Sequence, residues 1–223
     1  MTGSWRLLVV TAVELERTAV IRGLTIDVLD PAARIVVLAG GVGSAAAAAA
    51  TARALVRAEL AGVPFTAVIS AGIAGGVPGQ ADPPGTVLAT RTIAADLGAD
   101  SPDGFLSLAE LGFGSSVVEA DPALLQALRH GLPQAHTGEV LTVCTVTGTA
   151  AGAATLRARF PDAIAEAMEG FGVATAAEQA GLAFAELRTV SNPIGPRDRA
   201  SWRIGDALAA LTEAAAALAS LDR

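Results

Sequence analysis

The chain contains no lysine and no tyrosine, and each absence excludes a kind of chemistry. All 15 of its basic residues are therefore arginines. Without lysine there is no Schiff-base amine, no phosphate-loop lysine and no Ser–Lys dyad. Without tyrosine there is no phenolic acid. Any catalytic site in this chain must work without these two groups.

Cysteine and histidine are also scarce. Cys144 is the single cysteine, which excludes an intramolecular disulfide and a multi-cysteine metal site. It falls inside an apolar segment, so we expect a small hydrophobic residue of the core rather than a nucleophile. His130 and His136 lie in a polar region between a predicted helix and a predicted strand. We expect both to be solvated rather than catalytic or metal-binding.

Basic patches and long apolar runs are missing as well. The net charge is −7 and no basic run occurs, which gives nucleic-acid binding little support. The first apolar run, 7–13, meets Glu14 and Glu16 without a cleavage site, so no export signal is visible. The uncharged stretches 35–52 and 60–81 are interrupted by glycines, whereas a membrane span needs about 20 strongly apolar residues in a row. We predict a cytoplasmic protein.

The remaining composition favours an α/β fold. Hydrophobic residues make up 52% of the chain and charged residues 17%, which suits a sheet buried on both faces. At 223 residues, without a visible repeat or linker, the chain is expected to form a single domain over residues 1–223.

Short apolar runs alternate with helical segments along the chain. The predicted strands are 7–12, 34–39, 66–71, 86–95, 139–146 and 182–190, and the predicted helices are 13–22, 44–60, one opening at 121, 150–160, 168–180 and 200–221. The segment 96–118 is rich in Gly and Ser, and no element is predicted in it. Strands separated by helices indicate a largely parallel sheet flanked by helices.

Two predicted strands end in glycine-rich segments. The first, 39–43, resembles a phosphate loop but lacks the full spacing, so we favour a tight turn that needs positive φ. The second, 71–76, carries Gly75 and Gly76, which would let a flat ligand approach the backbone. Ligands of α/β sheets bind at the carboxyl ends of strands.

Three polar residues near strand ends have both a structural and a functional interpretation. Glu16 and Glu169 each fall in the first turn of a predicted helix, where acids complement the helix dipole. Asn192 precedes Pro193, as in many turns. A general base, however, would also project from such a strand end. Each structural interpretation is reasonable alone, but the three positions occur together and in order.

That order resembles the nucleoside phosphorylase and nucleosidase superfamily over nearly the whole chain. The resemblance rests on the segments 9–16 and 71–76, on Met168-Glu169 and on Ser191-Asn192. It implies a three-layer α/β fold, similar to purine nucleoside phosphorylase, with a central mixed, largely parallel sheet flanked by helices. It also implies a small nucleoside substrate, a homodimer or higher homo-oligomer, and no metal or organic cofactor. The Phe-containing stretch 104–118 is our candidate for the subunit contact.

The resemblance assigns roles to individual residues. Glu16 matches the glutamate that activates water, Glu169 the carboxylate on the ribose hydroxyls, and Met168 the residue against the sugar. Asn192 stands where adenine-specific members carry Asp, and it would stabilise the leaving purine. Further substrate contacts are expected from Ala74, Gly75, Val146, Thr147 and Arg197. Taken alone, 197–199 is simply a solvated loop.

Two departures from the family pattern refine the expected activity. Phosphorylases carry an Arg on the strand before the glycine loop, but 66–70 has no cation, which favours water over phosphate as the nucleophile. The Asn192 amide can donate a hydrogen bond to a 6-oxopurine, which an ionised Asp cannot do. The segment 191–202 is similar to that of a water-using member with this preference. We therefore expect hydrolysis of the N-glycosidic bond of a hypoxanthine nucleoside.

Three alternatives stay open at this point. The first is an adenine-releasing nucleosidase of the methylthioadenosine type, which Asn192 disfavours. The second is a catalytically silent nucleoside-binding protein, which would keep Glu169 and could lose Glu16. The third is a purely structural α/β domain, which leaves the joint placement of the site residues unexplained.

Overall fold

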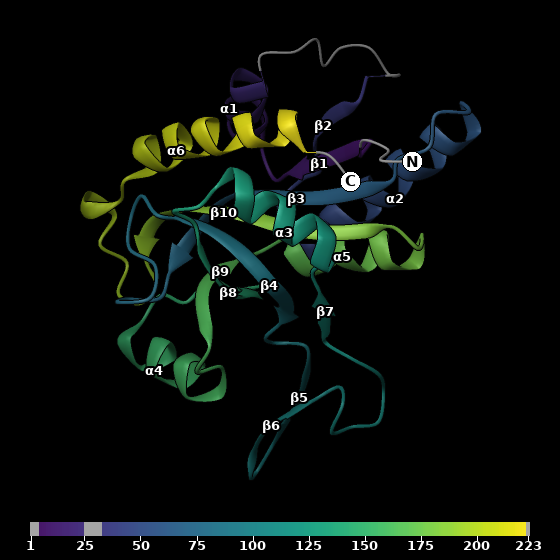
Figure 1. Ribbon diagram of the computed structural model, residues 1–223. Helices are drawn as coiled ribbons and strands as arrows, with labels where there is room; N and C mark the ends of the chain where they lie inside the picture. Colours follow the sequence, from purple (N-terminus) through teal and green to yellow (C-terminus); the bar gives the residue numbers. More distant parts are fainter. Residues whose placement is uncertain (1–4, 25–32, 222–223) are drawn as a thin grey trace.

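The computed structural model describes residues 5–24 and 33–221 (Figure 1). Within these residues, one mixed sheet of eight strands forms the centre, and a separate two-stranded hairpin projects from it. The strands of the main sheet are β1 (Leu7–Thr11), β2 (Ile35–Ala39), β3 (Ala67–Gly76), β4 (Thr86–Ala94), β7 (Val117–Glu119), β8 (His136–Thr142), β9 (Ala163–Ala167) and β10 (Ala183–Pro193). The hairpin consists of β5 (Gly98–Ser101) and β6 (Gly104–Ser107).

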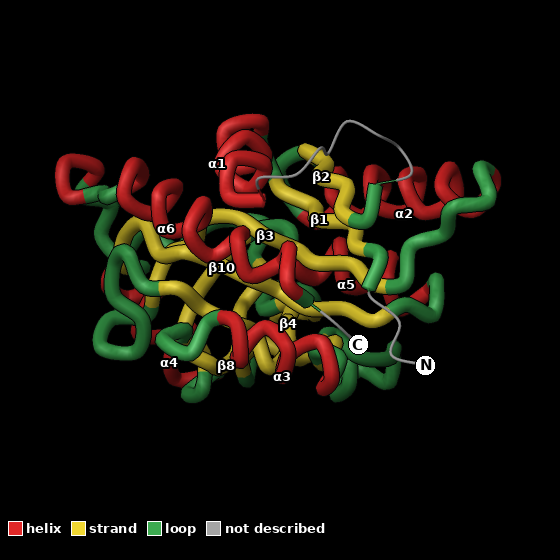
Figure 2. Tube along the Cα trace, turned by 45° about the horizontal axis from the view of Figure 1, so that its top comes forward, coloured by secondary structure: helices red, strands yellow, loops and turns green. Residues whose placement is uncertain are grey.

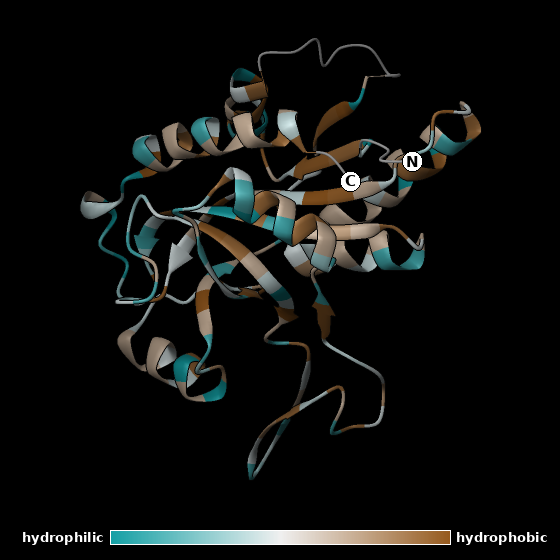
Figure 3. Ribbon diagram, in the orientation of Figure 1, coloured by the Kyte–Doolittle hydropathy of each residue, from teal (hydrophilic) through white to brown (hydrophobic). Residues whose placement is uncertain are grey.

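Helices cover both faces of the sheet, as Figure 2 shows. They are α1 (Glu14–Leu24), α2 (Ser44–Leu60), α3 (Pro122–Gly131), α4 (Ala150–Arg159), α5 (Gly170–Gln179) and α6 (Ile204–Ala216). Side chains alternate across β1: Leu7 and Val9 join the core beneath α1 and α6, whereas Leu8 and Val10 join the core beneath α2 and α5. This alternation produces the three layers, and Figure 3 shows the hydrophobic residues concentrated in the central strands.

Five strands of the sheet close into a ring. β3 pairs with β10, β10 with β4, β4 with β8, β8 with β9, and β9 with β3 again. The pairs β10–β4 and β9–β3 are antiparallel and the other three are parallel, so the sheet is mixed. β1 and β2 extend the sheet beyond β3 in parallel. A third hydrophobic cluster contains residues from all five ring strands.

Two strands continue further than the sequence indicates. β3 runs through the predicted glycine loop to Gly76, and β10 runs past Val190 to Pro193. The two strands pair side by side over this extension, with Asn192 opposite Gly75. The loop interpretation of 71–76 was wrong, because these glycines lie in a strand where neighbouring groups approach too closely for a side chain. A β-carbon on Gly76 would lie 2.0 Å from the Ala81 carbonyl oxygen.

The strand β8, in contrast, ends earlier than the sequence predicts. β8 ends at Thr142, not at residue 146, and Cys144 is exposed. The expectation of a buried Cys144 was wrong because the chain leaves the sheet here, with the Cys144 amide donating to the Asp96 carboxylate at 2.6 Å. As a result Val146 and Thr147 belong to a loop.

Other differences concern short elements. β9 was not predicted, and the segment 96–118 contains the β5–β6 hairpin and the start of β7. The helix predicted from residue 168 begins at Gly170, and the last predicted helix is divided into η1 (Arg199–Ser201), α6 and η2 (Ala217–Ser220). Among the described residues, no helix combines the length and the apolar character that crossing a membrane requires.

Candidate active site

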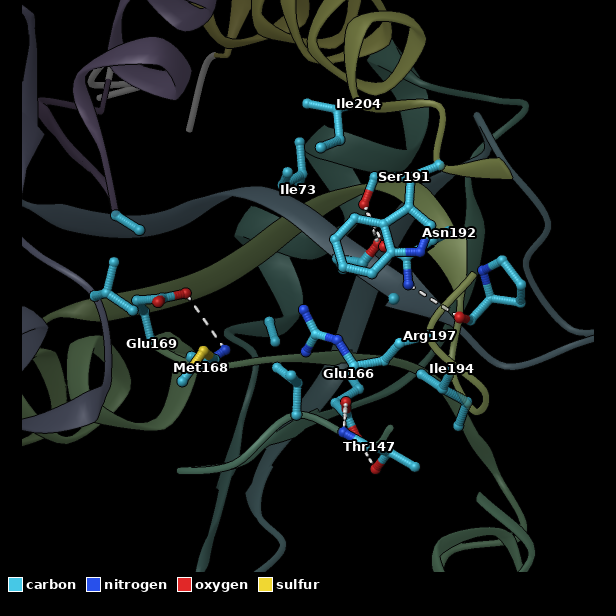
Figure 4. Close-up of a pocket in the computed structure, with 18 of the residues that line it drawn as sticks. Ile73, Thr147, Glu166, Met168, Glu169, Ser191, Asn192, Ile194, Arg197 and Ile204 are labelled. Atoms are coloured by element: carbon cyan, nitrogen blue, oxygen red, sulfur yellow. Dashed lines mark hydrogen bonds between the residues drawn. The ribbon is translucent and has the colours of Figure 1, made fainter. Parts of the chain in front are cut away.

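A cavity of about 330 Å³ opens where several strands end. Its walls come from the segment after β1, the ends of β3, β9 and β10, and the loop after β8. All of the predicted site residues line it: Glu16, Ala74, Gly75, Val146, Thr147, Met168, Glu169, Asn192 and Arg197. In Figure 4, Met168 and Glu169 are drawn at the left and Asn192 at the right, with Arg197 reaching between them.

Glu16 is held by the backbone at the start of α1. Its Oε2 accepts hydrogen bonds from the amides of Ala12 at 2.9 Å and Val13 at 3.2 Å, and its Oε1 accepts one from Ile73 at 2.9 Å. A carboxylate has about four acceptor positions, so about one remains for a water molecule in the cavity. The side chain is therefore fixed in direction and still able to accept a proton.

Glu169 lies directly before α5 and receives donors from three segments. Its Oε1 accepts from the Gly43 amide at 3.1 Å, and its Oε2 accepts from the Met168 amide and from Arg188, both at 3.4 Å. The Gly43 amide is available because the preceding turn has positive φ, 97° at Gly41 and 88° at Gly43. The tight-turn interpretation of 39–43 is confirmed, and the turn also orients a site carboxylate.

Arg188 is the main residue that the sequence analysis missed. It is 1% exposed, and its guanidinium donates to Glu186 at 2.8 Å and to Ser70 at 3.0 Å as well as to Glu169. Burial by itself lowers the pKa of Arg188, but the nearby carboxylates raise it above its usual value. A signal was present, because Glu186 and Arg188 are two charges placed two apart inside an apolar strand.

Gly72 lets Glu16 and Arg188 approach the same point of β3. A β-carbon at this position would lie 2.6 Å from Glu16 Oε1 and 2.9 Å from Arg188 Nη1. Real β-carbons do not come this close to other heavy atoms, so any other residue here would have to displace Glu16 or Arg188. The acid and the cation are thus brought together over bare backbone.

The Asn192 amide is oriented by its neighbours in the chain. Its Oδ1 accepts from the Ser191 hydroxyl at 2.8 Å, and its Nδ2 donates to the Pro193 carbonyl at 2.9 Å. An amide nitrogen carries two hydrogens, so one N–H remains for a ligand in the cavity. Asn192 therefore presents a donor.

Glu166 is a second residue that was missed, and it also lines the cavity. Its Oε1 accepts from the Thr147 amide at 2.7 Å, and its Oε2 accepts from the Thr147 hydroxyl. Burial raises the pKa of Glu166, while the two Thr147 donors act against that rise. It escaped notice because β9 is short and rich in alanine, which is depleted in strands.

Arg197 belongs to the loop after β10. Its guanidinium lies 5.1 Å from the centre of the Trp202 ring. Arg197 is exposed and lines the cavity. Among the residues that the structure describes, no cluster of three or more His, Cys, Asp or Glu side chains is arranged to hold a metal ion.

Comparison with known proteins identifies the family. Residues 13–223 match the phosphorylase superfamily. The futalosine hydrolase of Streptomyces coelicolor is 52% identical to this chain, over 96% of the chain and 94% of that protein. The futalosine hydrolase of Acidothermus cellulolyticus is 46% identical, over 96% and 91%.

A solved structure gives the same result for the fold. A 5′-methylthioadenosine/S-adenosylhomocysteine nucleosidase from Colwellia psychrerythraea, in complex with adenine, superimposes with a TM-score of 0.79 at 21% identity, covering 99% of this chain and 97% of that one. At this identity the likeness concerns the fold alone, and the predicted fold class is confirmed. The chain therefore belongs to the phosphorylase superfamily and, within it, to the futalosine hydrolases.

Proposed function

We propose that this protein hydrolyses the N-glycosidic bond of futalosine, releasing hypoxanthine and dehypoxanthine futalosine in the futalosine pathway of menaquinone biosynthesis. The identity of 52% to a futalosine hydrolase, over nearly the full length of both chains, supports the substrate. The observation that carries the chemistry is a single cavity that contains Glu16, Glu169 and the free N–H of Asn192.

Bond breaking would run ahead of water attack. The C1′–N9 electron pair leaves with the purine, which Asn192 stabilises through its N–H and which takes up a proton from solvent, while the proton that Glu16 accepts from the attacking water returns to solvent. The sugar becomes an oxocarbenium-like cation, favoured by the negative charge of Glu169. Water adds to C1′, and Glu16 accepts the proton that the water gives up. Positioned groups of this kind typically contribute about 10²–10⁴ each in rate.

Water, rather than phosphate, is the nucleophile in this proposal. The segment 66–70 carries no cation of its own, but Arg188 from β10 reaches Ser70 and places a cation beside that strand. Arg188 is, however, paired with Glu186 and Glu169, and Glu16 lies close by. Three carboxylates around one guanidinium make this region negative overall. A phosphate dianion would be repelled there, whereas neutral water would not.

Product chromatography tests this proposal. The purified protein is incubated with futalosine, inosine and methylthioadenosine, each with and without phosphate. We expect hypoxanthine from futalosine at a rate that does not depend on phosphate. Release of adenine from methylthioadenosine as the faster reaction would favour the adenine nucleosidase. Binding of a nucleoside without any product would favour a silent binding protein.

The setting of the reaction belongs to the same proposal. We place it in the cytoplasm, in a homodimer or higher homo-oligomer, as the sequence resemblance implies. Within the stretch 104–118, Phe113 is 78% exposed and is the residue that we assign to the subunit contact.

A further inference from the structure

Three neighbouring strands bring Glu166, Gly75 and Asn192 into line across the floor of the cavity. Gly75 on β3 is opposite Asn192 on β10 and also opposite Glu166 on β9. Residues opposite one another in a sheet place their side chains on the same face. Adjacent strands are about 4.8 Å apart, so the Glu166 and Asn192 backbones are about 10 Å apart with Gly75 between them.

Gly75 places no side chain of its own between Asn192 and Glu166. A β-carbon there would lie 2.9 Å from Ile194 Cγ2 and 3.7 Å from Asn192 Nδ2. Ile194 therefore occupies the space directly above Gly75, and Asn192 and Glu166 line the cavity on either side. A flat bicyclic ring that enters the cavity beside Ile194 can reach both side chains with its edge.

The two side chains offer opposite hydrogen-bonding chemistry. Asn192 has one free N–H donor, as described above. From the residues that the structure describes, Glu166 accepts two hydrogen bonds, both from Thr147, and a carboxylate has about four acceptor positions. A donor on one side and an acceptor on the other match a 6-oxopurine, which presents an oxo acceptor next to the N1–H donor. Adenine has the reverse pattern, with an amino donor next to an N1 acceptor.

A purely structural role does not account for a carboxylate at position 166. Among the described residues, Glu166 is 4% exposed and forms no ion pair with an arginine. Holding the Thr147 amide requires only an oxygen acceptor, which a neutral glutamine also supplies. A buried charge without a cation is costly, so it indicates a hydrogen-bond donor that arrives with a ligand.

We propose that Glu166 accepts the N1–H of the purine while Asn192 donates to its oxo edge, so that the two side chains together select a 6-oxopurine. This inference rests on the proposed function and adds a specificity-determining residue to it. The structure supplies the line Glu166–Gly75–Asn192, which the sequence alone does not show because the three residues come from three separate strands.

Glu166→Gln is the sharpest variant for a test. The Thr147 amide requires an acceptor, so it directs the glutamine oxygen toward itself. The NH₂ group then donates one hydrogen to the Thr147 hydroxyl and points the other at the base. That NH₂ opposes N1–H of hypoxanthine and complements N1 of adenine. Glu139→Gln is the matched control, because Glu139 is also a buried strand carboxylate but does not line this cavity.

Binding of free bases is measured by calorimetry on the full chain, with hypoxanthine, 1-methylhypoxanthine and adenine as probes. We expect the affinity ratio of hypoxanthine to adenine to fall about 10–100-fold in Glu166→Gln and to stay unchanged in Glu139→Gln. Wild type should prefer hypoxanthine over its N1-methyl form by at least about tenfold, and Glu166→Gln should lose part of that preference. Both proteins are tested with the same methylated base, so the steric effect of its methyl group cancels when the two preferences are compared.

The outcomes separate this inference from the proposed function. If wild type releases hypoxanthine from futalosine but Glu166→Gln leaves both ratios unchanged, Glu166 does not contact the base and only this inference fails. If futalosine is not hydrolysed while both ratios shift as expected, the proposed function fails and the recognition by Glu166 stands. Should the variant not fold, equal binding of hypoxanthine and 1-methylhypoxanthine to wild type would still overturn the inference.

Discussion

Glu14 and Glu16 are separated by one residue, yet only Glu16 faces the cavity. Two residues along an α-helix correspond to a rotation of about 200°, so these side chains point in nearly opposite directions. Glu14 is exposed and pairs with Arg17 at 3.2 Å, whereas Glu16 is turned inward onto three backbone amides. The helix period thus selects which of the two acids can act as a base.

Glu16→Gln should lower turnover by about 10²–10⁴-fold, because an amide cannot take the proton from water. Nucleoside affinity should change little, since the proposed ribose and base contacts come from other residues. The NH₂ group would oppose one of the amides that Glu16 now accepts, so we also expect a loss of about 1–3 kcal/mol in the free energy of unfolding. Steady-state kinetics, ligand titration and urea denaturation measure the three effects. Glu14→Gln is the control, and turnover of Glu16→Gln within about threefold of wild type would remove Glu16 from the mechanism.

Asn192→Asp should shift the base preference. An ionised Asp presents only acceptors and would oppose the 6-oxo oxygen, whereas the amino group of adenine can donate to it. We expect the ratio of kcat/KM for futalosine over aminodeoxyfutalosine to fall by at least about tenfold and at most about 10⁴-fold, the smaller value applying if water enters. An unchanged ratio would mean that Asn192 does not contact the purine edge.

β3 and β10 carry the site because they stay paired through both motifs. The pairing continues to Gly75–Asn192 and Gly76–Pro193, and a register shift between Val190 and Asn192 inserts Ser191 as an extra residue. Such a bulge redirects the side chains that follow it. Sequence periodicity predicted both strands but ended them early, because glycine, serine and asparagine are typical of turns.

Gly72→Ala tests whether β3 must lack a side chain at position 72, beneath the Glu16 carboxylate. The added methyl would displace Glu16 or Arg188, which are both buried and hydrogen-bonded. We expect turnover to drop by at least about 100-fold and the protein to lose about 1–3 kcal/mol of stability. The matched control is Gly205→Ala in α6, where an added β-carbon meets nothing within 4 Å. This substitution should stabilise the helix by about 0.5–1 kcal/mol. Wild-type turnover in Gly72→Ala would show that the two groups have other space to occupy.

The stability of the whole molecule depends on pH through the buried carboxyl group of Glu166. The pKa of Glu166 is raised in the folded protein, chiefly by burial. A carboxyl whose pKa is raised on folding contributes its stability fully below the unfolded-state pKa of about 4.3, and that contribution is lost as pH rises through the folded-state pKa. The ionised carboxylate therefore destabilises the fold at neutral pH.

Glu166→Gln should consequently gain stability relative to wild type as pH rises. The glutamine does not titrate, so the difference in free energy of unfolding between variant and wild type should be larger at pH 8 than at pH 4. Urea denaturation of both proteins at these two pH values measures this difference, and the other titrating groups cancel from it. A difference that stays constant or shrinks with pH would contradict the raised pKa.

Assembly is also decided by the whole surface. Phe113 lies in the segment between β6 and β7 and is 78% exposed, while Phe105 in the hairpin is covered by Arg159, whose guanidinium is 3.7 Å from the ring centre. If the stretch 104–118 forms the proposed subunit contact, Phe113→Ser should lower the mass measured by light scattering to that of a monomer. Leu60→Ser is the control, because Leu60 is equally exposed at the end of α2. Loss of the oligomer in the control instead would place the contact at α2.

Most of the fold, and nine of the residues that line the cavity, could be predicted from the sequence. Strand and helix periodicity is local, so the alternation of elements and a largely parallel sheet followed from it, whereas the mixed sheet was implied by the family resemblance. All nine expected residues line one cavity. β9 could not be predicted because its five residues are mostly alanine, and its strand conformation depends on pairing with β3 and β8. The end of β8 was also misplaced, since only the Asp96 contact shows where the chain leaves the sheet.

The sequence by itself therefore determined which side chains are available: carboxylates at two strand ends, an amide at a third, and no lysine or tyrosine. Only the tertiary structure decided how these groups act together. Arg188 reaches Glu169 across a strand, and Glu166 lies opposite Asn192 across Gly75. These contacts depend on strand pairing between segments far apart in the chain, and the period of a single strand carries no information about its partner.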